Sequence, residues 1–404
     1  MSIQDMSTED GELGFPFVAS TPWEPAPEFA RLREEEPVVR VRLPSTDHAW
    51  LVTGYAANRF VLGDPRFSRA AACAPGAPRL QPVPPDPTSL IAMDPPEHSR
   101  IRRLVSRAFN ARRLVALAPT IEKTAAALID ALVAAGPPGE LVNDLALPLP
   151  IGVICELLGV PFADRKRFQQ LADAVLSLTA HRKDEVLDAR QELNTYFGRL
   201  IEDKSREPKQ DLLSELVTAH EESDALTVEE LVALGRTLLT AGFHTTSNQI
   251  TLAALFLLRH PEQLRRLADS PELVEPTVEE LLRVNPLTVG GGLIRIATED
   301  VEVDGVRIAA GDAVLPAVGS ANRDAAFFAQ PDEFRPERTD NAHIAFGHGA
   351  HYCLGAQLAR LELRAAVGEL ARRLPNLRLA VPLTGLPFNT GRLFRGVAEL
   401  PVTW

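Results

Sequence analysis

Between residues 97 and 285 apolar side chains recur with the period of an α-helix, which is typical of helices that bury one face. The pattern predicts helices at residues 97–109, 116–135, 141–158, 164–178, 184–207, 227–259, 261–269, 272–284 and 355–374. Short apolar or alternating runs predict only a few strands, at residues 38–42, 50–53, 301–303, 306–308 and 313–317. The fold class is therefore mainly α, with a small β region.

The segment 227–259 is the longest of the predicted helices. Thr227 and Glu230 form a T-x-x-E capping box that fixes its start. At about 1.5 Å per residue, such a helix is roughly 45–50 Å long. Because much of its circumference is apolar, we expect a buried central helix.

No change of composition marks a linker, so we expect one large domain over residues 15–404. A proline-rich stretch at residues 75–95 predicts a long loop. The polar, acidic residues 1–14 are expected to be disordered, and they lack the apolar stretch of a signal peptide. No apolar run is long and uninterrupted enough to span a bilayer. We therefore expect a cytoplasmic protein that does not contact a membrane.

The chain carries 42 basic and 54 acidic residues, for a net charge of -12. This balance argues against a nucleic-acid-binding protein, whose binding surface is positive. Only three cysteines are present, Cys73, Cys155 and Cys353, and they lie far apart in the sequence. No disulfide framework is indicated, so one of them is a candidate for chemistry.

The ten residues from Phe346 to Gly355 read FGHGAHYCLG. Gly347 and Gly349 permit a tight turn with unusual dihedral angles. Cys353 then stands at the start of a predicted helix, where N–H groups and the helix dipole favour a thiolate. Gly355 has no side chain, so a flat macrocycle could approach the helix there, and Phe346 could pack beneath it.

Two other interpretations of this segment stay open on the residues alone. Cys353 could be a buried structural cysteine beside a glycine-rich turn. His348, His351 and Cys353 could also form part of a zinc site, although no fourth ligand is evident nearby.

The segment resembles the haem signature of the cytochrome P-450 family, F-x-x-G-x-[H/R]-x-C-x-G, at every fixed position. The resemblance implies haem b with Cys353 as the axial thiolate ligand of the iron. Such a ligand increases electron density on the iron and favours cleavage of the O–O bond. It also implies a single α-rich domain of the cytochrome P-450 type, with the long central helix over the haem.

Two further motifs stand in the order that the family has them. Glu280-x-x-Arg283 resembles its E-x-x-R motif, and Phe334-x-Pro-x-Arg338 resembles its F-x-P-x-R motif. The resemblance implies a structural network of Glu280, Arg283 and Arg338. The i, i+3 spacing places Glu280 and Arg283 on one helix face. Without the resemblance, such a pair would most often be a surface ion pair of little energetic value.

Four residues resemble the partners that the family uses for the haem propionates. His98 and Arg102 match its H-x-x-x-R pair, and Arg295 and His351 match two further partners. Two propionates need several such donors, because a carboxylate away from bulk water is costly unless it is paired.

Ala241 to Thr246 read AGFHTT and resemble the family's oxygen-activation motif, [A/G]-G-x-[D/E]-T-[T/S]. Ala241 and Gly242 are small enough for the helix to lie against haem. Thr245 can donate to the Ala241 carbonyl, and the resemblance implies that it helps to activate dioxygen. The alternative is a helix–helix contact through small residues.

His244 departs from the motif, which has Asp or Glu at this position. A histidine can relay protons, but it supplies no fixed negative charge. We take His244 and Thr245 as the candidate catalytic residues. The departure leaves coupling or rearrangement open beside ordinary hydroxylation.

The resemblance implies electron supply from a ferredoxin and its reductase, and so NAD(P)H indirectly. A candidate docking surface consists of basic residues, Arg103, Arg107, Arg112, Arg113, Arg360 and Arg364. Solvated helix faces would have a similar composition.

Substrate contacts are expected at Leu90, Gly242, Val289, Leu293 and Leu393, which are small or aliphatic and favour a bulky apolar ligand. The chain most resembles actinobacterial members that tailor macrolides and polyketides. We therefore predict a monomeric monooxygenase that inserts one atom of O₂ into a specialised metabolite by hydroxylation or epoxidation. The alternatives are a haem-thiolate oxidase for coupling or rearrangement, and a haem-binding protein without enzymatic activity.

Overall fold

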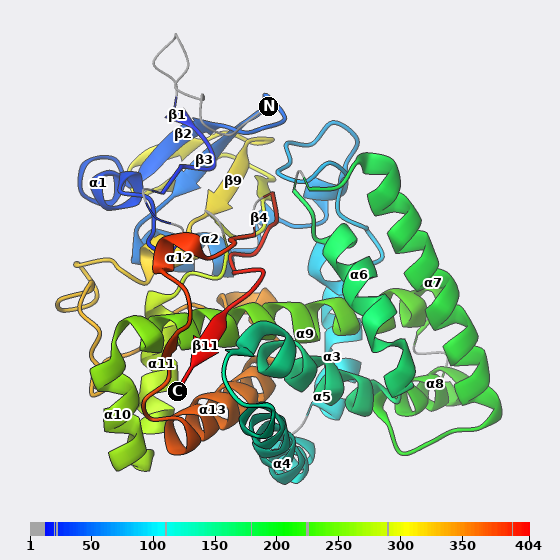
Figure 1. Ribbon diagram of the computed structural model, residues 1–404. Helices are drawn as coiled ribbons and strands as arrows, with labels where there is room; N and C mark the ends of the chain where they lie inside the picture. The colour runs from blue at the N-terminus through cyan, green and yellow to red at the C-terminus, as the bar shows by residue number, and fades with distance from the viewer. Residues whose placement is uncertain are drawn as a thin grey trace. The chain divides into compact units, whose positions relative to one another are not determined.

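A computed structural model describes residues 13–19, 21, 23–109, 111–178, 180–223, 226–288, 291–389 and 391–404 (Figure 1). The α-helices are α1 Glu28–Glu35, α2 Tyr55–Gly63, α3 Glu97–Ala108, α4 Ala111–Ala135, α5 Pro148–Leu158, α6 Arg165–Val175, α7 Lys183–Arg206, α8 Leu212–Ser223, α9 Val228–Arg259, α10 Pro261–Asp269, α11 Val274–Val284, α12 Val318–Ala321 and α13 Ala356–Arg373. The strands are β1 Leu13–Gly14, β2 Val38–Arg42, β3 His48–Val52, β4 Phe67–Ser68, β5 Gly139–Glu140, β6 Arg295–Ala297, β7 Val301–Val303, β8 Val306–Ile308, β9 Ala313–Pro316, β10 Arg378–Leu379 and β11 Pro401–Thr403. The mainly α fold with a small β region is confirmed.

The chain divides into two compact units. The first comprises the chain up to Pro87, together with Ile91–Ser99 and Glu280–Cys353. The second comprises Thr88–Leu90, Arg100–Glu279 and Leu354–Trp404. Whether the chain behaves as one domain remains a prediction.

The first unit is built on a six-stranded mixed sheet with the strand order β1-β2-β3-β9-β6-β4. The pairs β1–β2 and β3–β9 are parallel, and the remaining neighbours are antiparallel. The sheet covers an apolar core that includes Leu32, Val41, Leu51 and Leu315. The hairpin β7–β8 extends this unit, and α2 packs on β9 and on the turn at Gly349–His351.

The second unit is helical, and α9 is its central helix. Helices α5, α6, α7, α8, α10 and α13 all contact α9, and Figure 1 shows it as the longest helix of the chain. Thr227 caps α9: its hydroxyl accepts from the Glu230 N–H at 3.1 Å, and the Glu230 carboxylate accepts from the Thr227 N–H at 2.9 Å. The predicted capping box and the buried central helix are confirmed.

Helix α9 buries several Ser and Thr hydroxyl groups and is still a continuous α-helix. Each buried hydroxyl donates to the carbonyl four residues earlier, at 2.7–3.3 Å, in Thr237, Thr240, Thr246, Ser247 and Thr251, and the partly exposed Thr245 makes the same bond. A buried hydroxyl without a partner would be costly, and this local bond removes the cost.

The structure corrects several expected boundaries. The expected helix at 141–158 is interrupted: a π-helical turn at Val142–Ala146 precedes α5, which begins at Pro148 because proline is favourable in a first helical turn. Leu13 and Gly14 pair with β2, so they do not belong to a disordered tail, and residues 1–12 lie outside the described residues. Among the described helices, none is both long and apolar enough to cross a bilayer.

Candidate active site

The segment around Cys353 is a compact turn of the first unit. Gly347 and Gly349 have φ angles of 76° and 71°, in the left-handed region that glycine tolerates best. The Cys353 N–H donates to the Phe346 carbonyl at 2.9 Å, which closes the turn. The Cys353 side chain is exposed, and Gly355 occupies the N-cap position of α13. The predicted turn is therefore present, with the thiol accessible.

Gly349 also lies against the end of α2. A methyl group at this position would lie 2.6 Å from the Leu62 carbonyl oxygen and 2.8 Å from the Gly63 Cα. Both of these atoms belong to backbone, so neither can rotate away. Position 349 therefore requires glycine for its surroundings as well as for its φ angle.

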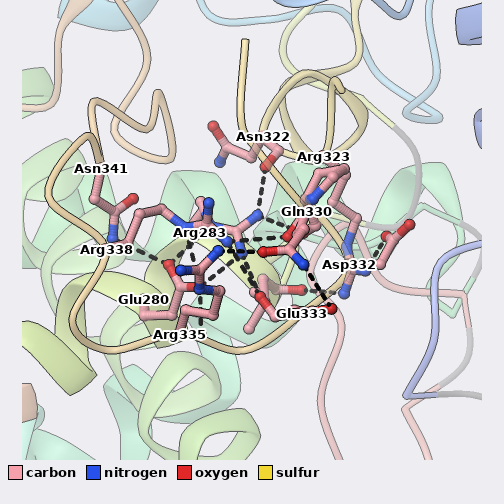
Figure 2. A network of polar contacts seen from close by, with 12 residues as sticks. Glu280, Arg283, Asn322, Arg323, Gln330, Asp332, Glu333, Arg335, Arg338 and Asn341 are labelled. Atoms are coloured by element: carbon pink, nitrogen blue, oxygen red, sulfur yellow. Dashed lines mark hydrogen bonds and ion pairs between the residues drawn. The ribbon is translucent and has the colours of Figure 1, made fainter. Parts of the chain in front are cut away.

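Glu280, Arg283 and Arg338 meet in a buried network of the first unit (Figure 2). The Glu280 carboxylate accepts from Nε and Nη2 of Arg283 at 2.8 and 2.7 Å, and both side chains are fully buried. Nε of Arg338 lies 3.4 Å from the same carboxylate. Burial raises the pKa of Glu280, but hydrogen bonds from Arg283 and the Arg335 N–H outweigh burial and hold it below its usual value.

The network reaches the Cys353 turn through one asparagine. Nη1 of Arg283 donates to the Asn322 carbonyl at 2.9 Å. The Asn322 side chain in turn accepts from the Ile344 N–H at 2.8 Å, and the Ile344 carbonyl accepts from the Gly347 N–H at 2.8 Å. A continuous set of hydrogen bonds thus joins the Glu280–Arg283 pair to the turn.

Basic side chains gather near His351 in the first unit. The rings of His98 and His351 lie with their centroids 4.3 Å apart, and His98, Arg69 and Arg295 are almost completely buried. Nη1 of Arg295 donates to the Phe67 carbonyl at 3.1 Å, whereas its buried Nε has no hydrogen-bond partner among the residues described. The nearby carboxylate of Asp94 accepts from the Arg69 N–H at 2.9 Å.

Among the residues described, Asp94 is the one carboxylate whose charge raises the pKa of Arg69, Arg295 and His351. Burial and the neighbouring Arg295 lower the pKa of Arg69 to about 10, and burial lowers that of Arg295 to about 10. Burial, with His98 and Arg295 nearby, lowers the pKa of His351 to about 3. An anionic ligand would relieve all of these shifts, so the donor set fits a carboxylate-bearing group such as a haem propionate. The sequence did not indicate Arg69, because no spacing motif includes it.

The other two cysteines are poor ligand candidates. Burial raises the pKa of the Cys155 thiol to about 12 and also raises that of Cys73. Over the described ranges, no three His, Cys, Asp or Glu side chains lie close enough to hold a metal ion, so His348, His351 and Cys353 do not form a zinc cluster.

The middle of α9 interrupts an otherwise buried stretch of helix in the second unit. Ala241 is exposed and Thr245 is partly exposed, whereas Phe243, His244 and Thr246 are buried. The Thr245 hydroxyl donates to the Ala241 carbonyl at 2.7 Å, as predicted. A small residue and a hydroxyl therefore share an accessible face of this helix.

His244 is directed elsewhere and has partners that the sequence did not indicate. Its Nε2 lies 2.5 Å from Oδ1 of Asp173 on α6, and its Nδ1 lies 3.0 Å from Nδ2 of Asn248. Nη1 of Arg392 lies 2.9 Å from the same Asp173 oxygen. No sequence motif links residues this far apart, so only the structure reveals the group.

Comparison with known proteins agrees with this geometry. The family model for cytochrome P-450 matches residues 160–270 and 269–387. Nocardicin C N-oxygenase of Nocardia uniformis subsp. tsuyamanensis is 47% identical over 98% of this chain and 100% of its own length. The chain belongs to the cytochrome P-450 family.

Further relatives of this cytochrome P-450 act on complex natural products. The mycinamicin IV hydroxylase/epoxidase of Micromonospora griseorubida is 46% identical over 93% of this chain and 94% of its own length. The solved cytochrome P-450 hydroxylase of the leinamycin pathway of Streptomyces atroolivaceus is 46% identical, with a TM-score of 0.89 over 97% of this chain and 100% of that one. A cytochrome P-450 with biaryl coupling reactivity is 41% identical, with a TM-score of 0.89 over 94% and 96%. This chain is accordingly a haem-thiolate monooxygenase, an oxidoreductase of the type found in specialised-metabolite pathways.

The expected substrate contacts of this cytochrome P-450 occupy different environments. Leu90 and Leu393 are buried in the second unit, and the hydroxyl of Ser89 lies 3.0 Å from that of Thr237 on α9. Leu293 is exposed in the first unit, and Val289 lies outside the described residues.

Gly242 differs from what we expected of a substrate contact. A methyl group there would lie 2.8 Å from Cδ1 of Ile154. Because that atom belongs to α5, the close approach of α5 explains the glycine, and the expectation of a substrate contact at Gly242 receives no support.

Ion pairs neutralise part of the expected basic surface in the second unit. Arg113 pairs with Glu215 at 2.6 Å, Arg360 pairs with Glu279 at 2.8 Å, and Arg364 also forms an ion pair, with Glu275. Arg102 is partly buried on α3, and Arg103 is exposed. The side chains of Arg107 and Arg112 lie outside the described part of the chain. The net positive charge available to an acidic partner is therefore smaller than the sequence suggested.

Proposed function

We propose that this cytochrome P-450 inserts one atom of dioxygen into a C–H or C=C bond of a bulky apolar specialised metabolite. The observation that carries the proposal is the accessible Thr245 hydroxyl beside Ala241, in the middle of an otherwise buried α9. A protein that only binds haem has no use for a hydroxyl there. The names of the relatives, which cover hydroxylation, epoxidation and N-oxygenation, support the same reaction class.

Haem b would be held by one set of residues at its iron and by another set at its propionates. The exposed Cys353 would supply the thiolate ligand; Phe346 lies in its turn, and Gly355 lies at the start of the next helix. His98, Arg102, Arg295 and His351 would bind the propionates, and the buried Nε of Arg295 supports this role most directly. When bound, the haem supplies the activation of dioxygen.

The chain's own contribution on the side of α9 is positioning and proton supply. Thr245 Oγ can exchange its bond to the Ala241 carbonyl for one to dioxygen, because both acceptors would lie along the same helix face. Ala241 leaves room for this exchange, since its side chain is a single methyl group. Positioned proton donors contribute about 10²–10⁴-fold in rate.

We also propose a ferredoxin and its NAD(P)H-dependent reductase as the electron source, with the monomeric enzyme acting in the cytoplasm. The cytochrome P-450 family, whose monooxygenases need electrons to reduce dioxygen, supports this proposal. Exposed Arg103 and the arginines near the start of α4 remain the proposed docking surface. Because Arg113, Arg360 and Arg364 are paired, we expect steering by charge to be moderate.

The proposed substrate is a macrolide- or polyketide-like molecule. Buried Leu90 and Leu393 of the second unit support an apolar wall. The second candidate is oxidative coupling or rearrangement, which His244 favours because the usual acid is absent from position 244. The relative with biaryl coupling reactivity supports this alternative.

Two measurements test the proposal. The spectrum of the reduced, CO-bound protein must show the red-shifted Soret band of thiolate-ligated iron. A library of macrolides and polyketides is then screened for compounds that shift the spin state of the haem iron. Each compound that binds is incubated with the enzyme, its electron source and isotopically labelled dioxygen. One labelled oxygen atom in the product supports monooxygenation. An unlabelled product with a new bond between carbons supports coupling, and the absence of a thiolate band contradicts the proposal.

A further inference from the structure

A buried polar group connects three segments of the second unit. Asp173 belongs to α6, His244 and Asn248 belong to α9, and Arg392 belongs to the C-terminal segment. Oδ1 of Asp173 accepts from Nη1 of Arg392 at 2.9 Å and lies 2.5 Å from Nε2 of His244. His244 and Asn248 are buried, and the Asp173 side chain is 22% exposed. We call these four residues the Asp173 cluster.

Asn248 determines which ring nitrogen of His244 carries the proton. Nδ2 of Asn248 lies 2.8 Å from the His244 carbonyl, which can only accept, so this atom is the amide nitrogen. The same nitrogen lies 3.0 Å from Nδ1 of His244, which must therefore accept as well. The proton of the neutral ring is then on Nε2 and is donated to Asp173.

Asp173 is a fixed negative charge in this arrangement. Burial raises its pKa, but the hydrogen bond from His244 and the charge and hydrogen bond of Arg392 outweigh burial and hold it below the usual value. The carboxylate that the family motif has at position 244 is thus present on another helix. It is joined to α9 through the imidazole.

Backbone hydrogen bonds hold the same segments together next to the cluster. The N–H groups of Leu178 and Ala180 donate to the Gly391 carbonyl at 2.9 and 3.2 Å. The Leu393 N–H donates to the Leu176 carbonyl at 3.3 Å, and Ser177 forms a β-bridge with Arg392. Asp173 therefore links α9, one residue before Thr245, to a short two-stranded contact between the end of α6 and the C-terminal segment.

We propose that Asp173 is a positioning residue for oxygen activation, which replaces the missing acid of α9 by orienting His244 and fixing a negative charge beside it. The proposal rests on the proposed monooxygenase function. Asp173 acts through His244, and Arg392 keeps the carboxylate in place. Loss of the cluster shifts the turn of α9 that carries Thr245, so more of the reduced oxygen leaves as hydrogen peroxide.

The test is a charge swap within the cluster. Asp173→His places two imidazoles beside each other, and His244→Asp places two carboxylates beside each other. The double variant Asp173→His with His244→Asp restores one imidazole and one carboxylate, with a similar total side-chain length. Arg167→Gln is the control, because Arg167 lies on the same helix α6 and its exposed ion pair is with Glu192 of α7. For each protein, the peroxide formed per NAD(P)H consumed is measured with ferredoxin and reductase. The measurement is made both with mycinamicin IV as the probe substrate and without it. The midpoint of thermal unfolding is measured for the same proteins.

We expect both single variants to raise the peroxide yield severalfold and the double variant to recover most of the loss. Residues in direct contact show such non-additivity. The control should match the unchanged enzyme. The proposal is overturned if the double variant is as uncoupled as the product of the single effects, or if Arg167→Gln raises peroxide equally at an equal loss of thermal stability. A CO-bound spectrum without the thiolate band in the unchanged protein would instead contradict the proposed function.

Discussion

The Glu280 carboxylate accepts two hydrogen bonds from the guanidinium of Arg283, and both side chains are completely buried. Removing one partner leaves a buried charge without compensation, which typically costs about 3–5 kcal/mol. We predict that Glu280→Gln lowers the free energy of unfolding by about that amount. Glu275→Gln is the matched control on α11, because its ion pair with Arg364 is largely exposed and should be worth about 0–1 kcal/mol. Denaturant unfolding of both variants tests this, and equal losses would contradict it.

The same pair predicts a dependence on pH. The pKa of Glu280 is lower in the folded protein than in the unfolded chain, so its contribution is fully present above the unfolded value and is lost as pH falls through the folded value. The penalty of Glu280→Gln should therefore shrink as the pH falls below about 4. Unfolding curves of the two proteins at a series of acidic pH values should converge, and parallel curves would argue against an ionised Glu280.

Cys353 is predicted to be the one cysteine required for the thiolate spectrum. Cys353→Ser should abolish the red-shifted band of the CO-bound protein, whereas Cys73→Ala and Cys155→Ala should retain it. Since the pKa of Cys155 is about 12, its thiol is protonated at pH 8 and should resist alkylation. Cys353 should react in the haem-free protein and be protected by haem. A retained band in Cys353→Ser would refute the assignment.

Arg295 is predicted to contribute directly to haem affinity. Its buried Nε lacks a partner among the residues described, so it has a hydrogen bond to offer an anion. A hydrogen bond to a charged group is worth about 1.5–3 kcal/mol, so Arg295→Gln should weaken haem binding by about ten- to a hundredfold. Haem transfer to apomyoglobin measures the change. Arg307→Gln, on the exposed hairpin β7–β8, should leave the transfer rate unaltered.

Thr245 is predicted to matter more than His244 for coupling. Consecutive helix residues point about 100° apart, and Nε2 of His244 is already joined to Asp173. Thr245→Ala should divert most reducing equivalents to peroxide, whereas His244→Ala should slow turnover more modestly, by roughly 10–100-fold. Product formed per NAD(P)H consumed ranks the two variants. Stronger uncoupling in His244→Ala, or nitrogen ligation in the ferric spectrum of the unchanged protein, would reverse the assignment.

Reversal of Arg112 and Arg113 to Glu is predicted to slow reduction by ferredoxin and to leave substrate affinity unchanged. The effect should be largest at low salt, where exposed charges are least screened. Reversal of Arg182, the N-cap residue of α7, and Arg206, in its last turn, to Glu changes the net charge equally and serves as the control. Stopped-flow reduction at several salt concentrations gives the answer. If the rates agree at low ionic strength, the partner binds another surface.

Local patterns in the sequence were sufficient for the long helices and for residues that act within a motif. The capping box at Thr227, the bond from Thr245 to Ala241 and the pairing of Glu280 with Arg283 all join residues three or four positions apart. The helices α1 and α2 were not expected, because their 8 and 9 residues are too few to establish a helical period.

Contacts between distant segments could not be predicted in this way. The buried Arg69 donates to the carbonyls of Ile91 and Ile294, and Asp173 meets His244 across 71 positions of sequence. Such contacts depend on how the helices and loops pack, which no spacing motif encodes. The sequence thus indicated Cys353 and the α9 residues as candidates, which stay predictions, and it did not indicate Arg69 or Asp173, which lie beside other candidate residues.

The close approach of Gly349 to the backbone at Leu62 and Gly63 has a consequence for engineering. No side chain fits between Gly349 and this backbone. The position of the end of α2 therefore restricts the path of the turn that carries Cys353. If the turn around Cys353 were replaced by that of a relative, the α2 of that relative would have to be transferred with it for the turn to keep its path. Libraries that aim to alter the surroundings of Cys353 should vary both segments together, because a change in one alone would alter the path of the turn.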